Sequence, residues 1–407
     1  MLDDPLNIFA EDLCQFLLGQ NKVIKGLLVK KHSVNLQTQG EFSFPSSVKS
    51  WHQYIGSCRP DFEGDILEYV GKNVEDIVNA SQQWNLSIKN IKVIKDRVHI
   101  FINRGAGIKL GLSTSLVNKD RLVECLSKRK CFARVDKTCE GTCVTSLRLK
   151  CLSEVINNLF AISPSDPGHS QGVVVTWKSS GSAAEGSSLL CGAVLNASTG
   201  LKEETLSGED FIRLRQNELT LIAQHKYGVR VATDDKWREF IAHLGESAVT
   251  FELLQTKPSC AVKINFDVSS GCSKGAAFVL YNCARLDTII RTYNERVTEG
   301  TYPPLPDFQH TDFSLLTQEE EWCLVFHYAL GLPAALRSAA ARPHLLCAFL
   351  SSMVKLISQY YRKTRVLTEP RKHLLPVMFA RLHLLTILNE NLKICLRVLN
   401  IKSVSQM

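Results

Sequence analysis

The chain has 407 residues, of which 45% are hydrophobic and 22% are charged, a composition typical of globular domains. This length is enough for two or three domains, each with its own core. The formal net charge is +8, and from Asp312 onward there are twelve Lys or Arg residues against six Asp or Glu residues. A basic excess in one domain suits a polyanionic partner, although many proteins of this charge bind no nucleic acid.

The fourteen cysteines are spread over the chain and never form a Cys-x-x-Cys pair. Cys139 and Cys143 are the closest pair, and they lack a second Cys or His pair at zinc-site spacing. We therefore expect reduced thiols and no metal, in a cytoplasmic or a nuclear protein. The N-terminus has no basic stretch before an apolar run, so no signal peptide is predicted. No apolar run approaches the roughly 20 residues that cross a bilayer, so no membrane contact is predicted.

Residues 1–112 are predicted to form a small α+β domain. Amphipathic patterns predict helices in AEDLCQFLLG and VEDIVNASQQW. The segment IKVIKDRVHIFINRG is rich in β-branched residues, and its apolar and polar residues alternate. This pattern predicts two strands with a turn at Lys95-Asp96-Arg97.

Residues 113–260 are predicted to form an α/β region. LKCLSEVINNLFAI predicts a helix, and VVVTW (173–177) predicts a strand buried on both faces, as in a parallel sheet. LLCGAVL predicts a second strand, and residues 209–257 are expected to be mainly helical. Residues 163–172 are typical of a loop. Residues 178–188, KSSGSAAEGSS, have almost no apolar bulk and are expected to be flexible.

Residues 261–407 are predicted to form helices only, arranged in a bundle. In GAAFVLYNCARLDTIIRTYNE an apolar stripe that begins at Phe278 predicts a buried helix face. Thr317 and Glu320 form a capping-box pattern before the next helix. The last helix places Asn389 on its apolar seam, where a polar side chain needs a partner.

Few patterns in the chain favour catalysis. Gly105, Gly107 and Gly111 follow a strand, but their G-x-G-x-x-x-G spacing does not match a dinucleotide-binding loop. We expect a glycine-rich turn there and no helix. The chain has no G-x-x-x-x-G-K-[ST] phosphate loop and no G-x-S-x-G nucleophile elbow.

The segment YYRKTRVLTEPRKH (360–373) combines cations with two tyrosines. Lys and Arg neutralise phosphates, and aromatic rings stack on unpaired bases, so the pattern fits a nucleic-acid site. It equally fits a solvated helix end, where cations are favoured by the helix dipole. The run KRKCFAR (128–134) fits a solvated loop better than an added phosphate contact.

Several motifs occur in order between residues 312 and 407, namely DFSLLTQEEEW, SQYYRKTRVL and FARLHLLTILNENLKICLRVLNI. Together they resemble the DALR anticodon-binding domain of arginyl-tRNA synthetases. FVLYNCARLDTII resembles the segment in which those enzymes carry Gln-Tyr-x-x-x-Arg, here with Leu280 before Tyr281 and Arg285. VHIFIN resembles the end of their N-terminal tRNA-core-binding domain.

The resemblance implies a multidomain α+β protein. Its parts are a small N-terminal α+β domain (1–112), a degenerate, Rossmann-like α/β middle (113–260), and a junction helix with an all-α DALR bundle (261–407). The middle departs from a working synthetase, because no His-x-Gly-His signature follows Asn103. Where those enzymes stabilise the triphosphate, LKEET places Glu203 and Glu204, which repel phosphate. We therefore predict no catalytic activity in this chain and no cofactor of its own.

GAAFVLYNCARL, TDFSLL and EPRKHL resemble the DALR anticodon-binding domain-containing protein 3 group. Members are regarded as tRNA-binding partners of a methyltransferase-like subunit that forms 3-methylcytidine in the anticodon loop of certain arginine tRNAs. The resemblance implies a non-catalytic tRNA adaptor, with S-adenosylmethionine on the partner subunit. Tyr361 is the expected stacking residue, and the other expected tRNA contacts are Arg285, Arg362, Lys363, Arg365, Arg371 and Lys372.

Two other classes of function stay open at this point. One is an active or residual arginyl-tRNA synthetase. The other is a protein-interaction scaffold that kept the fold and lost RNA binding. The expected location is the cytoplasm, with the nucleus as the alternative.

Overall fold

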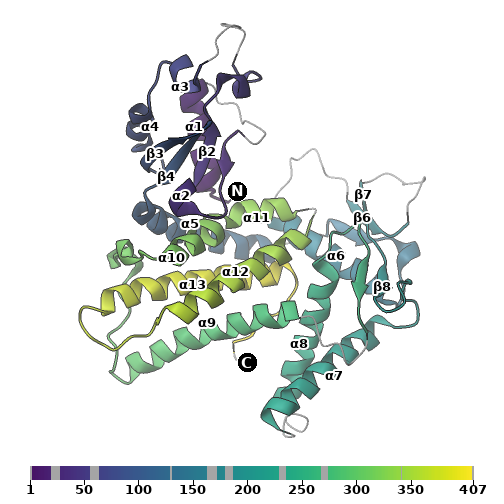
Figure 1. Cartoon of the computed structure of the whole chain (residues 1–407). Coiled ribbons are helices and arrows are strands. Elements are labelled where there is room, and N and C mark those ends of the chain that lie inside the picture. The colour runs from purple at the N-terminus through teal and green to yellow at the C-terminus, as the bar shows by residue number, and fades with distance from the viewer. Residues whose placement is uncertain are drawn as a thin grey trace.

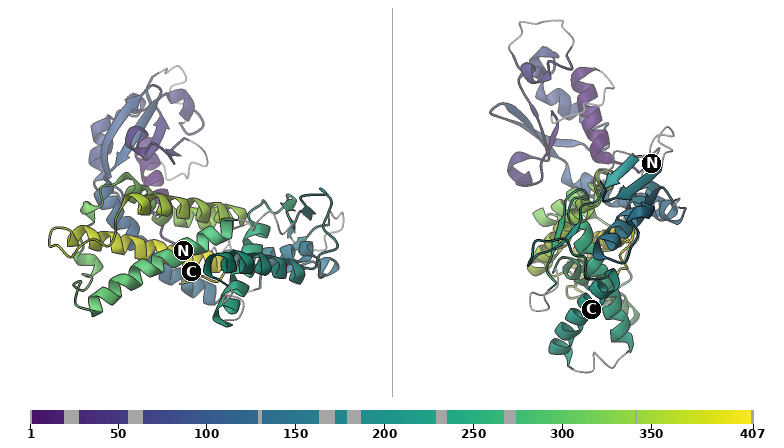
Figure 2. Two further views of the ribbon diagram at one scale, coloured as in Figure 1. Left: turned by 60° about the horizontal axis from the view of Figure 1, so that its bottom comes forward. Right: turned by 90° about the vertical axis from the view of Figure 1, so that its right-hand side faces the viewer.

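The computed structural model describes residues 2–19, 28–55, 64–128, 131–162, 172–178, 187–228, 235–266, 274–340 and 342–405. Figure 1 shows an N-terminal region of strands and helices, a bundle of long helices, and a region of short strands beside the bundle. In Figure 2 the N-terminal region stands out from an elongated body formed by the other two regions. The expected combination of a mixed N-terminal part, a parallel α/β part and a helical C-terminal bundle is confirmed, the bundle beginning at residue 274.

The N-terminal region is built on a four-stranded antiparallel sheet in the order β1-β2-β4-β3. β3 and β4 form the predicted strand pair, and Lys95 takes a left-handed φ of 55° in the turn between them. Phe9 of α1 packs on Phe42 of β2 with ring centroids 4.8 Å apart. The elements are α1 (Pro5–Leu18), β1 (Lys30–Lys31), α2 (Leu36–Gln39), β2 (Phe42–Pro45), α3 (Ile66–Tyr69), α4 (Val74–Ser81), β3 (Ile88–Ile94) and β4 (Arg97–Ile102).

The segment after β4 is a helix, α5 (Arg104–Ser127), and the expectation of a glycine-rich turn there is wrong. A Cβ atom at Gly107 would lie 2.8 Å from the side chain of Trp322. One at Gly111 would lie 2.7 Å from the side chain of Val325. These glycines therefore let α5 pack closely against the bundle. The domain boundary placed at residue 112 falls inside this helix.

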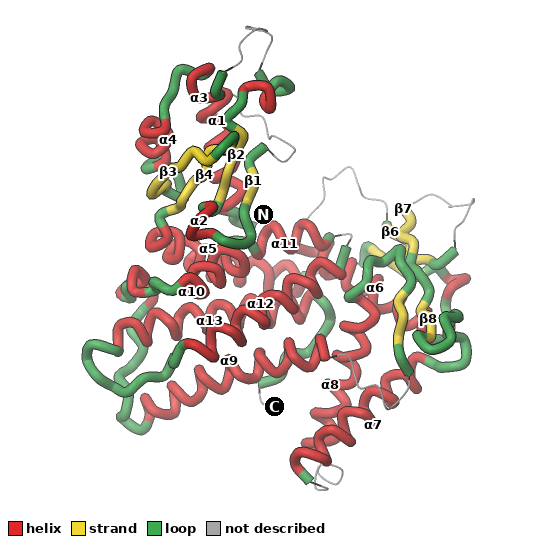
Figure 3. The backbone as a smooth tube through the Cα atoms, in the orientation of Figure 1, coloured by secondary structure: helices red, strands yellow, loops and turns green. Residues whose placement is uncertain are grey.

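The middle region contains two small parallel sheets, β5-β6-β7 and β8-β9 (Figure 3). The parallel pairing predicted for residues 173–177 is confirmed. LLCGAVL holds two strands in different sheets, so the prediction of one strand is wrong. Its Gly192 passes so close to Cys260 that a Cβ atom would lie 2.3 Å from the Cys260 backbone. The elements are β5 (Ala133–Val135), α6 (Val144–Ile162), β6 (Val173–Thr176), β7 (Ser187–Leu190), β8 (Val194–Asn196), α7 (Gly208–Tyr227), α8 (Asp235–Leu254) and β9 (Val262–Ile264).

The flexible stretch 178–188 falls mainly on residues outside the described ranges, and so does the loop at 163–172. The prediction of helices only after residue 260 is wrong, because β9 lies there and pairs with β8.

Arg148 of α6 ties the middle region together from inside. Its side chain is buried, and each of its five N–H groups has a main-chain carbonyl acceptor. Among the described residues no carboxylate pairs with it, and the partial negative charge at the C-terminal end of α8 takes that place. Burial lowers the pKa of the guanidinium. The five carbonyls belong to Gly192, Leu253, Thr256, Lys257 and Cys260.

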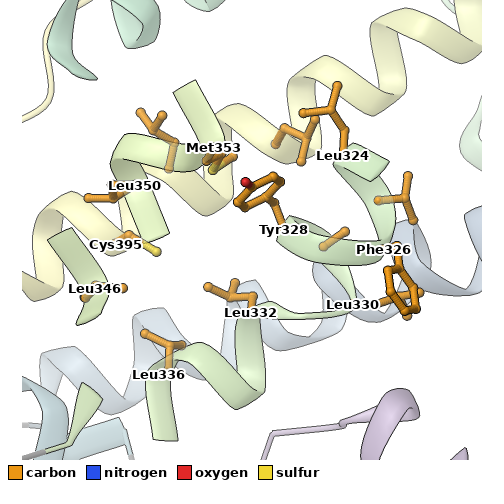
Figure 4. Close-up of a cluster of buried hydrophobic side chains, with 14 of the residues drawn as sticks. Leu324, Phe326, Tyr328, Leu330, Leu332, Leu336, Leu346, Leu350, Met353 and Cys395 are labelled. Atoms are coloured by element: carbon orange, nitrogen blue, oxygen red, sulfur yellow. The ribbon is translucent and has the colours of Figure 1, made fainter. Parts of the chain in front are cut away.

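The C-terminal bundle packs five helices and a π-helical turn, Val325–Ala329, around an apolar core (Figure 4). The predicted capping pair is displaced by one residue, because Glu321 accepts a hydrogen bond from the amide of Gln318 at 3.0 Å. Most of the apolar stripe of α9 is buried as predicted, whereas Ile290 and Val297 are half-buried and Phe278 is 37% exposed. The helices are α9 (Lys274–Thr298), α10 (Glu319–Leu324), α11 (Leu332–Ala339), α12 (His344–Lys363) and α13 (Leu375–Val398).

Candidate nucleic-acid interface

Arg285 of α9 lies beside two tyrosine rings, one on its own helix and one on α12. Its guanidinium carbon is 4.7 Å from the ring centre of Tyr281 and 4.8 Å from that of Tyr361. The Nη2 atom donates a hydrogen bond to the Tyr281 hydroxyl at 2.7 Å, as the i, i+4 spacing on one helix face allows. Within the described ranges no carboxylate pairs with Arg285. The site therefore presents a cation held by aromatic rings, with further N–H donors for an anion.

The two tyrosines are partly open to solvent. Tyr281 is 40% exposed and Tyr361 is 41% exposed. The neighbouring Tyr360 is buried, and its hydroxyl donates a hydrogen bond to Glu321 at 2.9 Å. Adjacent residues on a helix point in different directions, so Tyr360 can be buried while Tyr361 is exposed. Burial raises the pKa of the Tyr360 hydroxyl. Tyr360 thus anchors the end of α12 in the core and leaves Tyr361 on the surface.

Two adjoining depressions flank Tyr361. The first, of about 370 Å³, lies along α9, and the second, of about 420 Å³, lies along the chain that leaves α12. Ile289, Tyr361 and Leu367 line both, so the two form one continuous groove. We call this groove the α9–α12 groove. Its other lining residues are Tyr281, Ala284, Arg285, Thr288, Thr292, Arg362, Lys363, Thr364, Arg365 and Val366.

Three expected cations line the second half of this groove. Lys363 pairs with Glu320 at 2.5 Å, and its hydrogen bond holds the pKa of that carboxyl below the usual range. Arg365 donates from Nε to the carbonyl of Leu367 at 3.2 Å. Arg362 is exposed and has no ion-pair partner among the described residues. All three lie at or just after the end of α12, where the helix dipole also favours cations.

Arg371 and Lys372 lie apart from the groove. Both are exposed on the segment before α13, and Arg371 pairs with Glu369 at 2.7 Å. Neither residue lines either depression. The structure therefore brings together five of the seven expected contact residues, namely Arg285, Tyr361, Arg362, Lys363 and Arg365.

Tyr281 is the aromatic lining residue of the groove that was not among the expected tRNA contacts. Its i, i+4 spacing to Arg285 was a signal for this pairing, since such residues share a helix face. The role of Ile289 and Leu367 in joining the two depressions could not be seen in the sequence. It depends on how the chain after α12 folds back on α9.

A separate depression of about 500 Å³ lies on the N-terminal region, between β3, β4 and the start of α5. Lys92 holds its ammonium 5.2 Å from the ring centre of Phe101 on the neighbouring strand. The depression thus combines cations with an aromatic ring, as the α9–α12 groove does. It is lined by Gln37, Lys89, Asn90, Lys92, Phe101, Ile102, Asn103, Arg104 and Gly105.

The two glutamates of LKEET in the middle region lie in different surroundings. Glu203 is 7% exposed and accepts hydrogen bonds from the amides of Thr205 and Leu206, each at 3.0 Å. The hydroxyl of Thr205 lowers the pKa of this carboxyl. Glu204 is exposed and pairs with Lys202 at 2.9 Å. Glu203 therefore shapes a local turn, and only Glu204 faces solvent.

The described residues contain no group of three or more His, Cys, Asp or Glu side chains placed to hold a metal ion. In the same ranges no helix is long and apolar enough to span a membrane.

Residues 279–407 match the family model of the DALR anticodon binding domain. This part of the chain is therefore similar to a DALR anticodon binding domain. The match begins within α9 and covers the whole α9–α12 groove. The resemblance of the C-terminal motifs to this domain is confirmed.

Curated relatives extend the similarity beyond the DALR domain. The chain is 32% identical over 266 residues to the DALR anticodon-binding domain-containing protein 3 of Danio rerio, covering 61% of this chain and 47% of that protein. It is 33% identical over 214 residues to the Rattus norvegicus protein of the same name, covering 50% and 39%. The arginine–tRNA ligase of Thermococcus kodakarensis is 27% identical over 178 residues, covering 43% and 26%. The matches thus span about half or less of each relative.

The arginyl-tRNA synthetase of Thermus thermophilus has a similar fold. Its solved structure matches with a TM-score of 0.61 at 11% identity, and the match covers 99% of this chain and 100% of that chain. At this identity the likeness shows the fold alone. The expected relation to the synthetase architecture is therefore confirmed for the arrangement of the chain.

Proposed function

We propose that this chain binds tRNA and catalyses no reaction itself. The observation that carries the proposal is the α9–α12 groove, which lies in the DALR domain and combines Arg285 with exposed aromatic rings and three cations. Cations attract phosphates, and rings such as Tyr361 stack on unpaired bases. An anticodon loop offers both features, a backbone and bases that are not paired. The groove would therefore hold the anticodon loop.

The N-terminal region would make a second contact with the body of the same tRNA. Its depression offers Lys89, Lys92 and Phe101, again cations beside a ring. Arg371 and Lys372 would add phosphate contacts outside the groove, since both are exposed. Two linked surfaces bind one long ligand more tightly than either surface alone.

The finer proposal is an adaptor for arginine tRNAs. A methyltransferase-like partner would bind S-adenosylmethionine and form 3-methylcytidine in the anticodon loop that this chain presents. The similarity to relatives named DALR anticodon-binding domain-containing protein 3 supports this role. The internal use of Glu203 and Arg148 supports the lack of synthetase chemistry in the middle region. The cytoplasm is the proposed location.

Binding of tRNA is tested by titrating labelled arginine tRNA and an unrelated tRNA at two salt concentrations. The proposal expects binding that weakens steeply with salt, by a slope near 0.7 per phosphate contact in log–log form. No binding at low salt, with or without a co-purified partner, would contradict it. Affinity purification, with sequencing of the bound RNA and identification of the bound protein, tests the adaptor role.

The synthetase-like fold is also compatible with a second function, that of an active or residual arginyl-tRNA synthetase. ATP–pyrophosphate exchange with arginine decides between the two. The adaptor proposal expects no exchange above a blank. An exchange that depends on arginine would overturn the non-catalytic part of the proposal.

A further inference from the structure

One contact between the N-terminal region and the bundle is made by a buried carboxylate, that of Glu41, beside the ring contact of Phe42 with Phe326. The residue is 0% exposed and precedes β2. Its Oε2 accepts a hydrogen bond from the amide of Ile102 at 2.8 Å. Its Oε1 accepts from Nε1 of Trp322 at 2.8 Å and from Nε and Nη2 of Arg104 at 3.1 and 3.0 Å. Both carboxylate oxygens thus accept hydrogen bonds, Oε2 from one N–H group and Oε1 from three.

These donors come from three different parts of the chain. Ile102 ends β4 in the N-terminal region, Arg104 begins α5, and Trp322 belongs to α10 of the bundle. Arg104 also pairs with Glu319 of α10. The carboxylate of Glu41 therefore bonds to the sheet, the connecting helix and the bundle at once. At the rim of the same joint, Arg337 of α11 pairs with Asp4.

The donors around Glu41 can only donate. An indole N–H, a guanidinium and a main-chain amide have no acceptor atom to offer. An uncharged amide in place of the carboxylate would turn an NH₂ group toward at least one of them and lose the attraction to Arg104. The joint thus requires a carboxylate at this position, and a change that preserves volume is enough to weaken it.

Two of the same residues line the N-terminal depression. Ile102 and Arg104 form part of its wall, beside Lys92 and Phe101. The position of this depression relative to Arg285 and Tyr361 therefore depends on the bonds that Glu41 makes. A shift at the joint would move one proposed RNA contact relative to the other without touching either.

We propose that Glu41 is a positioning residue that fixes the N-terminal depression relative to the α9–α12 groove, so that one tRNA contacts both at once. This inference rests on the proposed function. Two contacts held at the correct spacing act with a high effective concentration, and that advantage falls when their relative position varies. Glu41 would therefore matter for a full-length tRNA and not for an isolated anticodon stem-loop.

The test compares the full chain with the variant Glu41→Gln for two RNAs, a full-length tRNA and its anticodon stem-loop. We expect the Kd for the stem-loop to stay within about twofold, while full-length tRNA binds at least tenfold more weakly. Glu124→Gln is the matched control, because Glu124 is an exposed carboxylate on α5 that pairs with Lys128 alone among the described residues. It should change neither Kd.

Trp322→Phe separates the joint from the fold of the N-terminal region. This change removes the indole donor and leaves the bonds of Glu41 to Ile102 and Arg104 in place. We expect the same selective loss for full-length tRNA, with amide exchange in β3 and β4 unchanged. A loss in Glu41→Gln that Trp322→Phe does not share overturns the inference, and so does an equal loss for both RNAs. If the unaltered chain binds neither RNA, the proposed function fails instead.

Discussion

Asn389 of α13 donates a hydrogen bond from Nδ2 to Oδ1 of Asp287 on α9, at 2.7 Å. Asn389 is 1% exposed, and Lys393 reaches the same carboxylate oxygen at 2.8 Å. The helix that carries Arg285 is thus fixed to the last helix by a polar contact inside an apolar seam. This is the partner that the position of Asn389 in the sequence required.

Replacing Asn389 by Leu should destabilise the bundle by about 1–3 kcal/mol, because Asp287 loses one of its donors in a partly buried site. Thermal unfolding followed by circular dichroism measures the effect as a lower melting temperature. Gln359→Leu, on the exposed side of α12, is the control and should leave the melting temperature nearly unchanged. Equal melting temperatures for the two variants would mean that the contact contributes nothing.

Replacing Arg362, Lys363 and Arg365 together by Ala should weaken tRNA binding and change folding little. Exposed ion pairs such as Lys363–Glu320 contribute only about 0–1 kcal/mol to stability. Loss of three phosphate contacts should make the slope of log affinity against log salt concentration shallower by about 2. Filter binding at several salt concentrations measures the affinity and this slope. The control replaces Arg213, Lys236 and Arg238, on α7 and α8, by Ala, and it should leave tRNA binding unchanged. A collapse of the melting temperature in the first variant would mean that Arg362, Lys363 and Arg365 stabilise the fold.

Tyr361 should act through its ring and not through its hydroxyl. Tyr361→Phe keeps the ring beside Arg285 and should bind tRNA as the unaltered chain does. Tyr361→Ala removes a stacking platform worth about 1–3 kcal/mol per base, so the Kd should rise by roughly 5- to 150-fold. The comparison is made by titrating an anticodon stem-loop. Equal affinity of the Phe and Ala variants would exclude base stacking on this ring.

Two glycines of α5 should respond in opposite ways to the same substitution. Gly111→Ala places a Cβ 2.7 Å from Val325 and should cost about 1–3 kcal/mol through overpacking. In Gly105→Ala the new Cβ would lie 3.8 Å from its nearest neighbouring atom. This change should be neutral or slightly stabilising, because alanine favours a helix. Chemical denaturation of both variants gives the comparison. A stable Gly111→Ala protein would show that α5 can move away from the bundle.

Cys143, just before α6, should be the fast-reacting thiol when compared with the buried cysteines. Burial raises its pKa, but hydrogen bonds from Ser146 and Thr145 and the charge of Lys202 outweigh that effect, so its pKa is lowered. Burial raises the pKa of Cys283 and Cys395 to about 12. Thiolate at Cys143 is lost as pH falls through its lowered pKa, and alkylation slows accordingly.

Mass spectrometry of iodoacetamide labelling against pH checks this expectation. The midpoint for Cys143 should lie below the ordinary thiol value, and Ser146→Ala should move it upward because a hydrogen bond to the thiolate is lost. If Cys283 or Cys395 reacts as fast as Cys143 in the folded chain, the assignment of these environments is wrong.

Strong periodicity made the long helices predictable. The apolar stripes of α9, α12 and α13 recur every three or four residues, and such a pattern has one stable outcome, a buried face. α5 was missed because Gly105, Gly107 and Gly111 argue against a helix locally. Gly107 and Gly111 are needed only because they pack on Trp322 and Val325, which lie more than two hundred residues further along the chain. The division of LLCGAVL into two strands depends in the same way on the close approach to Cys260.

In the candidate site, too, groupings of residues close in sequence could be predicted, and contacts between distant residues could not. Tyr361, Arg362, Lys363 and Arg365 are close in sequence, so their common location at the end of α12 could be predicted. Arg371 and Lys372 continue the same charged segment, yet neither lines the groove. Glu41 and Trp322 are 281 positions apart and follow no spacing rule. A contact of this kind appears only once the chain has folded.

Arg148 supplies the middle region with an internal cation, which many proteins obtain by binding a metal ion from solution. Five carbonyl oxygens surround its guanidinium, much as carbonyls surround a bound cation in an ion site. Here the cation is covalently attached to α6, so it cannot be removed by dilution, by a chelator or by a change in ionic composition. The loop after α8, the approach to β9 and the link between β7 and β8 are therefore organised around an internal charge that is present from synthesis onward.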